Sequence, residues 1–307
     1  MNALNAPGEK TMTDTLIAYI KLARPKHWIK NALVFAPLLY ARRLLLPAPL
    51  ISACFCFVSF CLISSAVYAI NDIFDAPEDR ARPEKRSRPV ALGQIKPVHA
   101  GVFATLLAIC ALLTAAFGAG SFRVAVYAGL YLLLNIAYSL RLKRLVIIDC
   151  FCVAAGFVLR VFAGGAAGEA DVSGWLFLTM FAASLFMAFG KRRGELARLA
   201  ASAEYPGAKN HVTLYSGYDP DFLSGMVYTF AGLSIVFYSL WALQNTASMI
   251  YSAPLIVFII CRYLLIIRIA NSLGDPTTII LGDLTLKISI ILFILLSVCL
   301  IYFSGES

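Results

Sequence analysis

Apolar runs of about 20 residues recur along the whole chain, and this feature constrains the fold more than any other. About 20 apolar residues are needed to cross a bilayer as a helix, which satisfies its own backbone polar groups there. Of the 307 residues, 60% are hydrophobic and 14% are charged, whereas soluble domains carry about 45–50% and about 25%. This composition excludes a water-soluble globule, a disordered chain and a fibrous repeat. The sequence predicts an all-α integral membrane protein.

About nine membrane-spanning helices are expected. They cover roughly residues 28–46, 50–70, 98–117, 122–138, 146–163, 173–190, 222–242, 248–270 and 284–303. The first is the weakest, because Pro37 and the pair Arg42–Arg43 interrupt it, so a re-entrant or interfacial segment is the alternative there. We expect residues 1–27 to form an N-terminal segment on the cytoplasmic side and residues 28–303 to form a single membrane domain.

Basic residues predict how the bundle is oriented. With the N-terminus inside, one side receives most of the Lys and Arg residues, and the other receives only Arg42, Arg43 and Arg123. The positive-inside rule places the basic side in the cytoplasm, which predicts a multi-pass protein of the inner (plasma) membrane. The long polar segments 71–97 and 191–221 lie on this side. A membrane enzyme that takes a charged substrate from the cytoplasm needs such a face, so we expect a polar cavity that opens there. A transporter or lipid-binding protein remains the alternative of a different class.

The end of the second predicted span carries the motif Asn71-Asp72-Ile73-Phe74-Asp75-Ala76-Pro77-Glu78-Asp79-Arg80. Asp72, Asp75 and Asp79 are spaced i, i+3 and i+7, so a helix places them on one face. Three converging carboxylates repel one another unless a cation joins them, and Mg²⁺ is commonly shared between carboxylates and substrate phosphates. The alternative is a solvated acidic loop. We predict that these three residues bind Mg²⁺ and are catalytic.

Basic residues follow the acidic motif closely, at Lys85, Arg86 and Arg88. They act in part as a topology signal, but acids and bases in one segment also suit a phosphate–metal complex, because guanidinium groups bind phosphate oxygens in forked pairs. Further cations on the same face could hold additional phosphates, and short basic clusters favour phosphorylated ligands or anionic headgroups over nucleic acid. These further candidates are Lys26, Lys30, Lys143, Arg144, Lys191, Arg192 and Arg193.

Three other polar residues are candidates for the site. Asp149 lies at the cytoplasmic mouth of its predicted span and is a candidate site residue. Arg160 follows 11 residues later, roughly 16 Å along the same helix, and a mid-membrane arginine must face the interior and find a partner. A structural pair is the alternative for Arg160. Asp275, in Gly274-Asp275-Pro276-Thr277, either forms a turn or, with Asp283, holds ribose hydroxyls or a second metal.

Several motifs together resemble one family. The acidic motif is similar to the first aspartate motif of UbiA-type intramembrane prenyltransferases, and the resemblance covers nearly the whole chain. Further stretches resemble the decaprenyl-phosphate phosphoribosyltransferase branch of that superfamily. These stretches are Arg24–Asn31, Lys85–Pro89, Tyr138–Lys143, Asp149, Gly156–Arg160, Gly190–Glu195, Gly274–Thr277 and Asp283.

The resemblance implies a UbiA-like helical bundle and an Mg²⁺-dependent transfer of 5-phosphoribosyl from phosphoribosyl diphosphate to a polyprenyl phosphate. It adds Lys143 and Asp149 to the catalytic set. The substrate-binding set that it implies comprises Lys26, Lys30, Asn71, Lys85, Arg86, Arg88, Tyr138, Arg144, Arg160, Lys191, Arg192 and Asp275.

The chain also departs from the superfamily pattern. Many members carry a second DxxxD motif after the fourth or fifth span, whereas this chain offers only Asp149 there, with Lys143 and Arg144 before it. The departure weakens the alternative enzyme, an aromatic (4-hydroxybenzoate-type) polyprenyltransferase that uses a polyprenyl diphosphate. Within the branch, Arg82-Pro83 replaces an expected His-Pro and Ala91-Leu92-Gly93 replaces an expected Ala-Ser-Gly, and neither of these two changes removes a carboxylate.

Overall fold

The computed structural model describes residues 12–81, 85–201, 217–269 and 276–303, and within these ranges all regular structure is helical. Among the described residues, eight helices are long and apolar enough to cross a membrane, so the predicted fold class is confirmed. These spans are α3 (Pro47–Ala81), α4 (Pro97–Leu113) with η2 (Thr114–Gly118), α5 (Phe122–Leu140), α6 (Ile148–Ala167), α7 (Gly174–Ala201), α9 (Pro220–Asn245), α10 (Ala253–Ile269) after η5 (Ala247–Ser252), and α12 (Leu284–Tyr302).

The predicted first segment, 28–46, accounts for the difference between eight spans and about nine. It forms the 3₁₀ helix η1 (Pro25–Phe35) and the five-residue helix α2 (Ala36–Tyr40). Pro37 lacks a backbone N–H group and interrupts the hydrogen-bond ladder. Arg42 adopts a left-handed conformation with φ of 56°, so the chain turns there before α3 begins.

Helix starts follow simple capping chemistry. Pro47, Pro97 and Pro220 each stand at the first position of a span, where the missing N–H group costs nothing. Asp219 caps α9 by accepting a hydrogen bond from the Phe222 backbone N at 2.8 Å, and Asp283 caps α12 through the Leu286 N at 2.7 Å. The short helix α11 (Pro276–Gly282) precedes α12.

Helix α6 is the centre of the bundle, in contact with α3, α5, α7, α2 and η1. Small residues permit this packing, as is usual where helices approach closely in membranes. At Gly164, a Cβ atom would lie 2.0 Å from the carbonyl oxygen of Val34 on η1. Glycine at this position therefore lets the broken first segment lie directly against α6.

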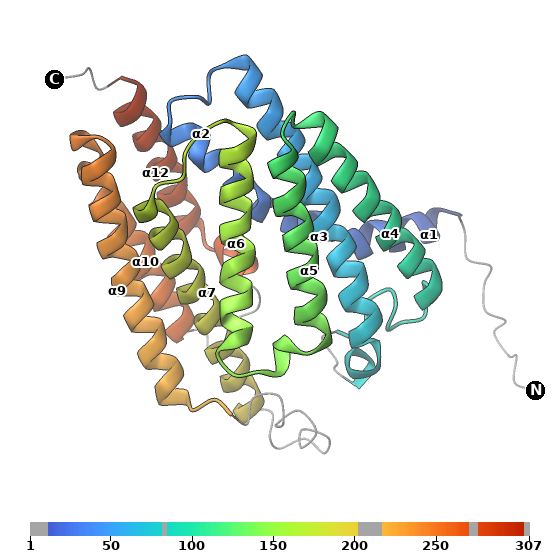
Figure 1. Cartoon of the computed structure of the whole chain (residues 1–307). Coiled ribbons are helices and arrows are strands. Elements are labelled where there is room, and N and C mark those ends of the chain that lie inside the picture. The colour runs from blue at the N-terminus through green and yellow to red at the C-terminus, as the bar shows by residue number, and fades with distance from the viewer. Residues whose placement is uncertain (1–11, 82–84, 202–216, 270–275, 304–307) are drawn as a thin grey trace, which may run out of the picture.

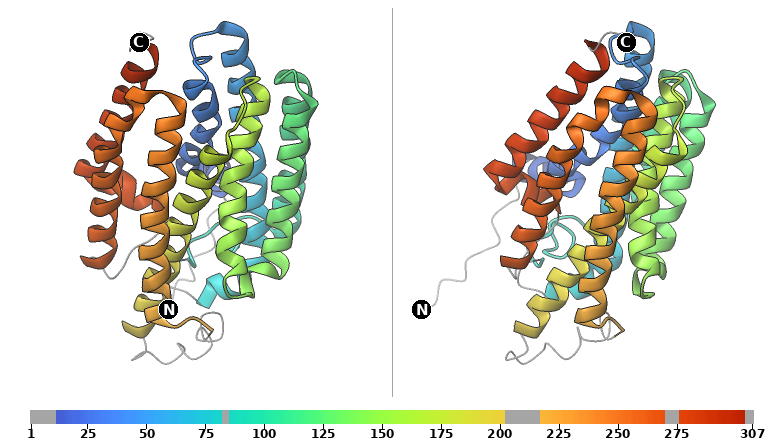
Figure 2. Two further views of the ribbon diagram at one scale, coloured as in Figure 1. Left: turned by 60° about the vertical axis from the view of Figure 1, so that its left-hand side comes forward. Right: turned by 90° about the vertical axis from the view of Figure 1, so that its left-hand side faces the viewer.

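The polar segments converge at one end of the bundle. In Figure 1 the C-terminal end of α3, the connection from α5 to α6 and the C-terminal end of α7 all lie at the bottom. Figure 2 shows the same ends together after rotation. Because α3 has 35 residues, it is about 52 Å long and extends well beyond the ~30 Å hydrocarbon layer. We call this region, with Asn71–Ala81 of α3, η3 (Leu142–Arg144) and Lys191–Glu195 of α7, the polar end.

A short helix, α1 (Met12–Ala23), runs across the long helices in Figure 1. Ala18 and Leu22 are buried in a cluster with Ala66 and Ala69 of α3. This contact fixes the start of η1 and hence Arg24, whose backbone is left-handed with φ of 51°.

Candidate functional site

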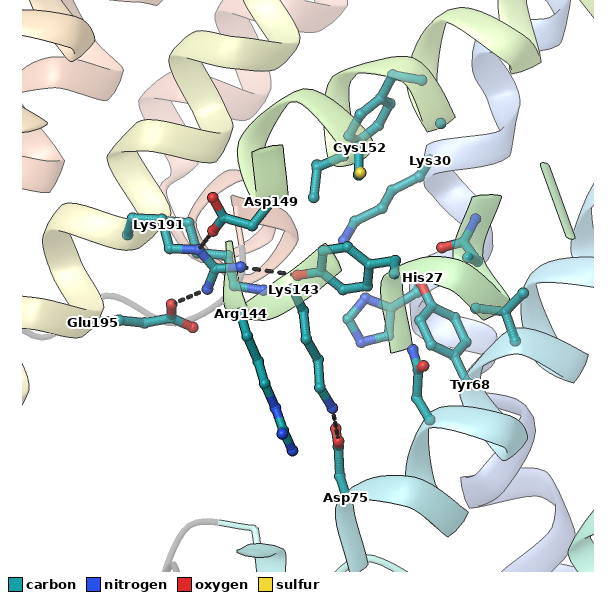
Figure 3. Close-up of a pocket in the computed structure, with 18 of the residues that line it drawn as sticks. His27, Lys30, Tyr68, Asp75, Lys143, Arg144, Asp149, Cys152, Lys191 and Glu195 are labelled. Atoms are coloured by element: carbon teal, nitrogen blue, oxygen red, sulfur yellow. Dashed lines mark hydrogen bonds and ion pairs between the residues drawn. The ribbon is translucent and has the colours of Figure 1, made fainter. Parts of the chain in front are cut away.

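A cavity of about 280 Å³ lies at the polar end, between α3, α5, α6, α7 and η1. It brings together most of the residues predicted for the site. The predicted residues that line it are Lys30, Asn71, Asp75, Lys85, Arg88, Tyr138, Lys143, Arg144, Asp149, Arg160, Lys191 and Arg192. Figure 3 shows Lys30, Asp75 and Lys143 directed into the same space.

The acidic wall of this cavity is one face of α3. Arg88 Nη1 lies 3.4 Å from Asp72 Oδ1, 3.9 Å from Asp75 Oδ2 and 2.6 Å from Asp79 Oδ2. A single guanidinium can reach all three carboxylates only because the helical spacing aligns them. Asp72 and Asp79 are buried, and Asp75 is the one that lines the cavity.

Two more cations approach these carboxylates from other elements. Arg24 donates to Asp72 Oδ1 from the start of η1, and Lys143 donates to Asp75 Oδ1 from η3. The Arg24 guanidinium also lies 5.0 Å from the centre of the Tyr68 ring, within the range of a cation–π contact. Helix α3 is therefore linked to both neighbouring segments by ion pairs.

A second cluster forms the opposite wall around Asp149, which is 2% exposed. Arg192 of α7 donates to Asp149 Oδ2, to Glu195 Oε2 at 2.5 Å and to the Tyr138 hydroxyl at 2.9 Å (Figure 3). Tyr218, just before α9, donates to Asp149 Oδ1 at 2.5 Å. This network ties α5, α6, α7 and the start of α9 together at the mouth of the cavity.

Tyr218 has a second partner, since its hydroxyl oxygen accepts a hydrogen bond from the Ile147 backbone N at 2.7 Å. Ile147 has a positive φ of 71° directly before α6, and a positive φ is strained for a β-branched residue. Burial, and next the bond to Asp149, raise the pKa of Tyr218. The neutral hydroxyl is thereby kept as the donor that orients Asp149.

The inner end of the cavity is formed by Arg160, which is 5% exposed. Its Nε donates to Asn31 Oδ1 at 2.7 Å, Nη1 to the Gly156 carbonyl at 2.7 Å, and Nη2 to the Tyr131 hydroxyl at 2.8 Å. The predicted inward orientation of Arg160 agrees with this geometry, and all three partners are neutral groups.

Some predicted residues lie elsewhere. Lys26 and Arg86 are exposed and do not line the cavity, because the 3₁₀ turn and the loop point them outward. Arg193 donates to Ser224 on α9 at 3.0 Å. Asp275 lies outside the described residues. Asp283 pairs with Arg262 at 2.7 Å, and this donated hydrogen bond lowers the pKa of the Asp283 carboxyl.

Several residues that line the cavity are not among those predicted from the sequence. They are Arg24, His27, Tyr68, Glu78, Tyr131, Asn135, Glu195 and Tyr218, together with apolar side chains. Arg24 and Glu195 lie inside stretches that resemble the family, so those motifs could have indicated that they belong to the site. Tyr131 and Asn135 fall one helical turn apart in an apolar span, and that spacing could have indicated an inward face. Nothing in the sequence around Tyr218 distinguishes it from other loop tyrosines.

The acidic wall suits a divalent metal in its chemistry. In the part of the chain that the structure describes, no three His, Cys, Asp or Glu side chains converge closely enough to hold a metal ion unaided. The Asp72 Oδ2 atom, however, is buried without a hydrogen-bond partner. Carboxylate oxygens are the ligands that Mg²⁺ prefers, and it usually takes one or two of them together with substrate phosphates. The residues present therefore fit a metal that arrives with a phosphorylated substrate.

Fold and site define a polytopic helical membrane protein with a pocket, lined by both carboxylates and cations, at one end of the bundle. The chain belongs to the UbiA prenyltransferase family, whose model matches residues 32–276.

Two curated relatives match most of the chain. A decaprenyl-phosphate phosphoribosyltransferase of Mycolicibacterium smegmatis is 34% identical over 93% of this chain and 92% of its own length. One of Corynebacterium glutamicum is 32% identical over 95% of this chain and 88% of its own. A solved UbiA homologue from Archaeoglobus fulgidus, bound to GPP and Mg²⁺, superposes with a TM-score of 0.73 at 20% identity, covering 92% of this chain and 99% of that one. This likeness supports the fold.

Proposed function

We propose that the protein transfers the 5-phosphoribosyl group from phosphoribosyl diphosphate to a polyprenyl (decaprenyl-type) phosphate and releases diphosphate. One observation of the site carries the proposal. The wall opposite the acids of α3 is rich in cations, including Lys143, Arg144, Lys191 and Arg192, so the pocket has charge for more phosphate groups than one diphosphate. The full-length similarity to decaprenyl-phosphate phosphoribosyltransferases supports the same reading.

In this proposal, Asp72, Asp75 and Asp79 would hold Mg²⁺ on the diphosphate. Arg88 and Lys143 lie close enough to bind the negative charge of the diphosphate when it enters the site. When bound, the metal neutralises negative charge that develops on the leaving diphosphate. Lys143 and Arg88 reach the carboxylates now, and they can turn to phosphate oxygens when a metal takes the carboxylates. Once they face the phosphate oxygens, their charge would stabilise the departing diphosphate.

Bond changes in the transfer are few. The bond between ribose C1 and the diphosphate oxygen breaks, the electron pair leaves with diphosphate, and an oxygen of the lipid phosphate forms a new bond to C1. The lipid phosphate is already an anion, so no side chain has to act as a strong base. The protein contributes by aligning the two reactants and by excluding other nucleophiles.

We also propose that the polar end faces the cytoplasm. Its cations greatly outnumber those of the other end, where Arg43 contacts the Gly168 carbonyl and Glu169. The positive-inside rule then gives the orientation, and soluble phosphoribosyl diphosphate would enter from that side.

A transfer assay on the purified protein tests the proposed reaction. Radiolabelled phosphoribosyl diphosphate, a polyprenyl phosphate and Mg²⁺ are incubated with the protein, and the label that enters the organic phase is measured with and without EDTA. We expect label in the organic phase that EDTA abolishes. No transfer, but prenylation of 4-hydroxybenzoate from a polyprenyl diphosphate, would overturn the proposal in favour of an aromatic prenyltransferase.

A further inference from the structure

The environment of Arg160 is unusual for a buried charge. Within the part of the chain that the structure describes, no carboxylate oxygen lies within 4.0 Å of its guanidinium nitrogens. Its N–H groups donate hydrogen bonds to neutral groups only, and the rings of Tyr131, Phe157 and Phe60 lie 4.5, 5.3 and 6.0 Å from the guanidinium carbon. Neutral partners and ring faces offset only part of the cost of burying a charge.

The guanidinium is also held in one orientation. Asn31, which accepts from Nε, is 0% exposed, and its amide nitrogen lies 3.3 Å from Ser64 Oγ and 3.4 Å from Cys61 Sγ on α3. This arrangement directs the amide oxygen at Arg160. These three hydrogen bonds use three of the five N–H groups of the guanidinium, so two remain for a ligand.

Arg160 and Tyr131 both line the cavity that opens at the polar end. The positive charge of Arg160 is fixed, buried and without a counter-ion at the inner end of this polar cavity. Such a site favours the binding of an anion that can enter the cavity. Guanidinium groups match phosphate oxygens in geometry as well as in charge.

We propose that Arg160 binds the phosphate monoester of a substrate at the inner end of the cavity. The inference rests on the proposed function, which supplies two such groups: the 5-phosphate of phosphoribosyl diphosphate and the phosphate of the lipid. Asn31 and Tyr131 are positioning residues that hold the guanidinium ready. The diphosphate binds separately, at the acidic wall of α3.

Binding measurements on the purified protein in detergent test this site without turnover. Titration calorimetry with inorganic phosphate, ribose 5-phosphate and decyl phosphate gives affinities for the wild type, for Arg160→Gln and for Asn31→Asp. We expect each variant to bind at least one ester about 10- to 100-fold more weakly, the range for losing a hydrogen bond to a charged group. Arg123→Gln, at the opposite end of the bundle, is the matched control and should bind as the wild type does.

Asn31→Asp distinguishes a phosphate-binding role of Arg160 from a purely structural one. It places a carboxylate beside Nε, so the buried charge gains a counter-ion while the fold keeps its volume. We expect unchanged or higher thermal stability together with weakened phosphate binding. If Asn31→Asp keeps both its stability and its full phosphate affinity, the proposal is wrong. The proposal is also wrong if Arg160→Gln binds the esters as tightly as the wild type does.

The two esters identify the source of the phosphate. A loss confined to ribose 5-phosphate assigns Arg160 to the sugar substrate, and a loss confined to decyl phosphate assigns it to the lipid. Wild-type protein that binds an ester through Arg160 but transfers no label would contradict the proposed reaction while supporting the anion site. Transfer by the wild type, with no Arg160-dependent binding, would contradict only the anion site.

Discussion

At the scale of single residues, the site is a set of ion pairs that join distant parts of the chain. Asp75 of α3 pairs with Lys143 of η3, and Asp149 of α6 pairs with Arg192 of α7. These contacts are partly or fully buried, where removing one partner leaves an expensive unpaired charge. A test of their function must therefore separate the loss of a structural pair from the loss of a ligand for substrate.

Exchanging the two charges of the Asp75–Lys143 pair makes this separation. The single variant Lys143→Asp should lose both stability and transfer activity, because it sets two carboxylates against each other. The double variant Asp75→Lys with Lys143→Asp restores opposite charges, so we expect its melting temperature to recover most of the loss. Its transfer rate should stay about 100-fold or more below that of the wild type. Recovery of activity along with stability would show that the pair is only structural.

Tyr218 should contribute mainly by holding Asp149 and Ile147. Tyr218→Phe removes the hydroxyl that bonds both groups, and we expect unfolding to become easier by about 1–3 kcal/mol, measured by chemical or thermal denaturation. Because the pKa of Tyr218 is raised in the folded state, its contribution is present below the ordinary value of 10.0 and declines as the pH rises past that value. The difference between wild type and variant should be constant from about pH 7 to 9. A difference that shrinks within that range would contradict this role.

At the scale of elements, the apolar runs predicted the spans closely. The segment expected at 122–138 is α5 at Phe122–Leu140, and the one expected at 284–303 is α12 at Leu284–Tyr302. Long, strongly apolar segments are the most predictable elements because the bilayer itself fixes their length and conformation. The segment 28–46 was less predictable. Its proline and arginine residues indicate that the helix is interrupted, but the conformation of the interrupted segment depends on its packing against α6.

Gly164 tests whether that packing fixes the broken segment. A Cβ at this position meets the Val34 carbonyl, so Gly164→Ala should lower the free energy of unfolding by about 2 kcal/mol or more. The matched control is Gly129→Ala on α5, where a Cβ meets nothing within 4 Å, and helix propensity should leave the protein as stable or about 0.5–1 kcal/mol more stable. Thermal unfolding in detergent measures both variants, and equal effects would refute close packing at Gly164.

At the scale of the whole molecule, the pocket depends on contacts that the sequence pattern does not specify. Spacing on α3 placed three carboxylates on one face, but their partners, Arg24 and Lys143, lie 48 and 68 residues away from Asp72 and Asp75. Tyr218 lies 69 residues from Asp149. Such pairings are set by which helices become neighbours, and this information is absent from local periodicity. Residues inside recognisable motifs could be proposed for the site, and residues outside them, such as Tyr218, could not.

Orientation of the whole molecule gives a further prediction. Ser87 is exposed near the polar end, and Glu169 is exposed near the opposite end. In intact cells, a membrane-impermeant maleimide should label Glu169→Cys and should label Ser87→Cys only after the membrane is permeabilised. The eight native cysteines are replaced beforehand by alanine or serine. The reverse pattern of labelling would place the polar end outside the cell.

The most direct test of the proposed reaction and its site compares three purified proteins in one transfer assay. Wild type, Asp75→Asn and the opposite-end control Glu169→Gln are given labelled phosphoribosyl diphosphate, polyprenyl phosphate and Mg²⁺. We expect wild type and Glu169→Gln to move label into the lipid phase at similar rates, and Asp75→Asn to transfer about 100-fold less while remaining folded. Full Mg²⁺-dependent transfer by Asp75→Asn would contradict the assignment of the acidic wall of α3 as the centre of the reaction.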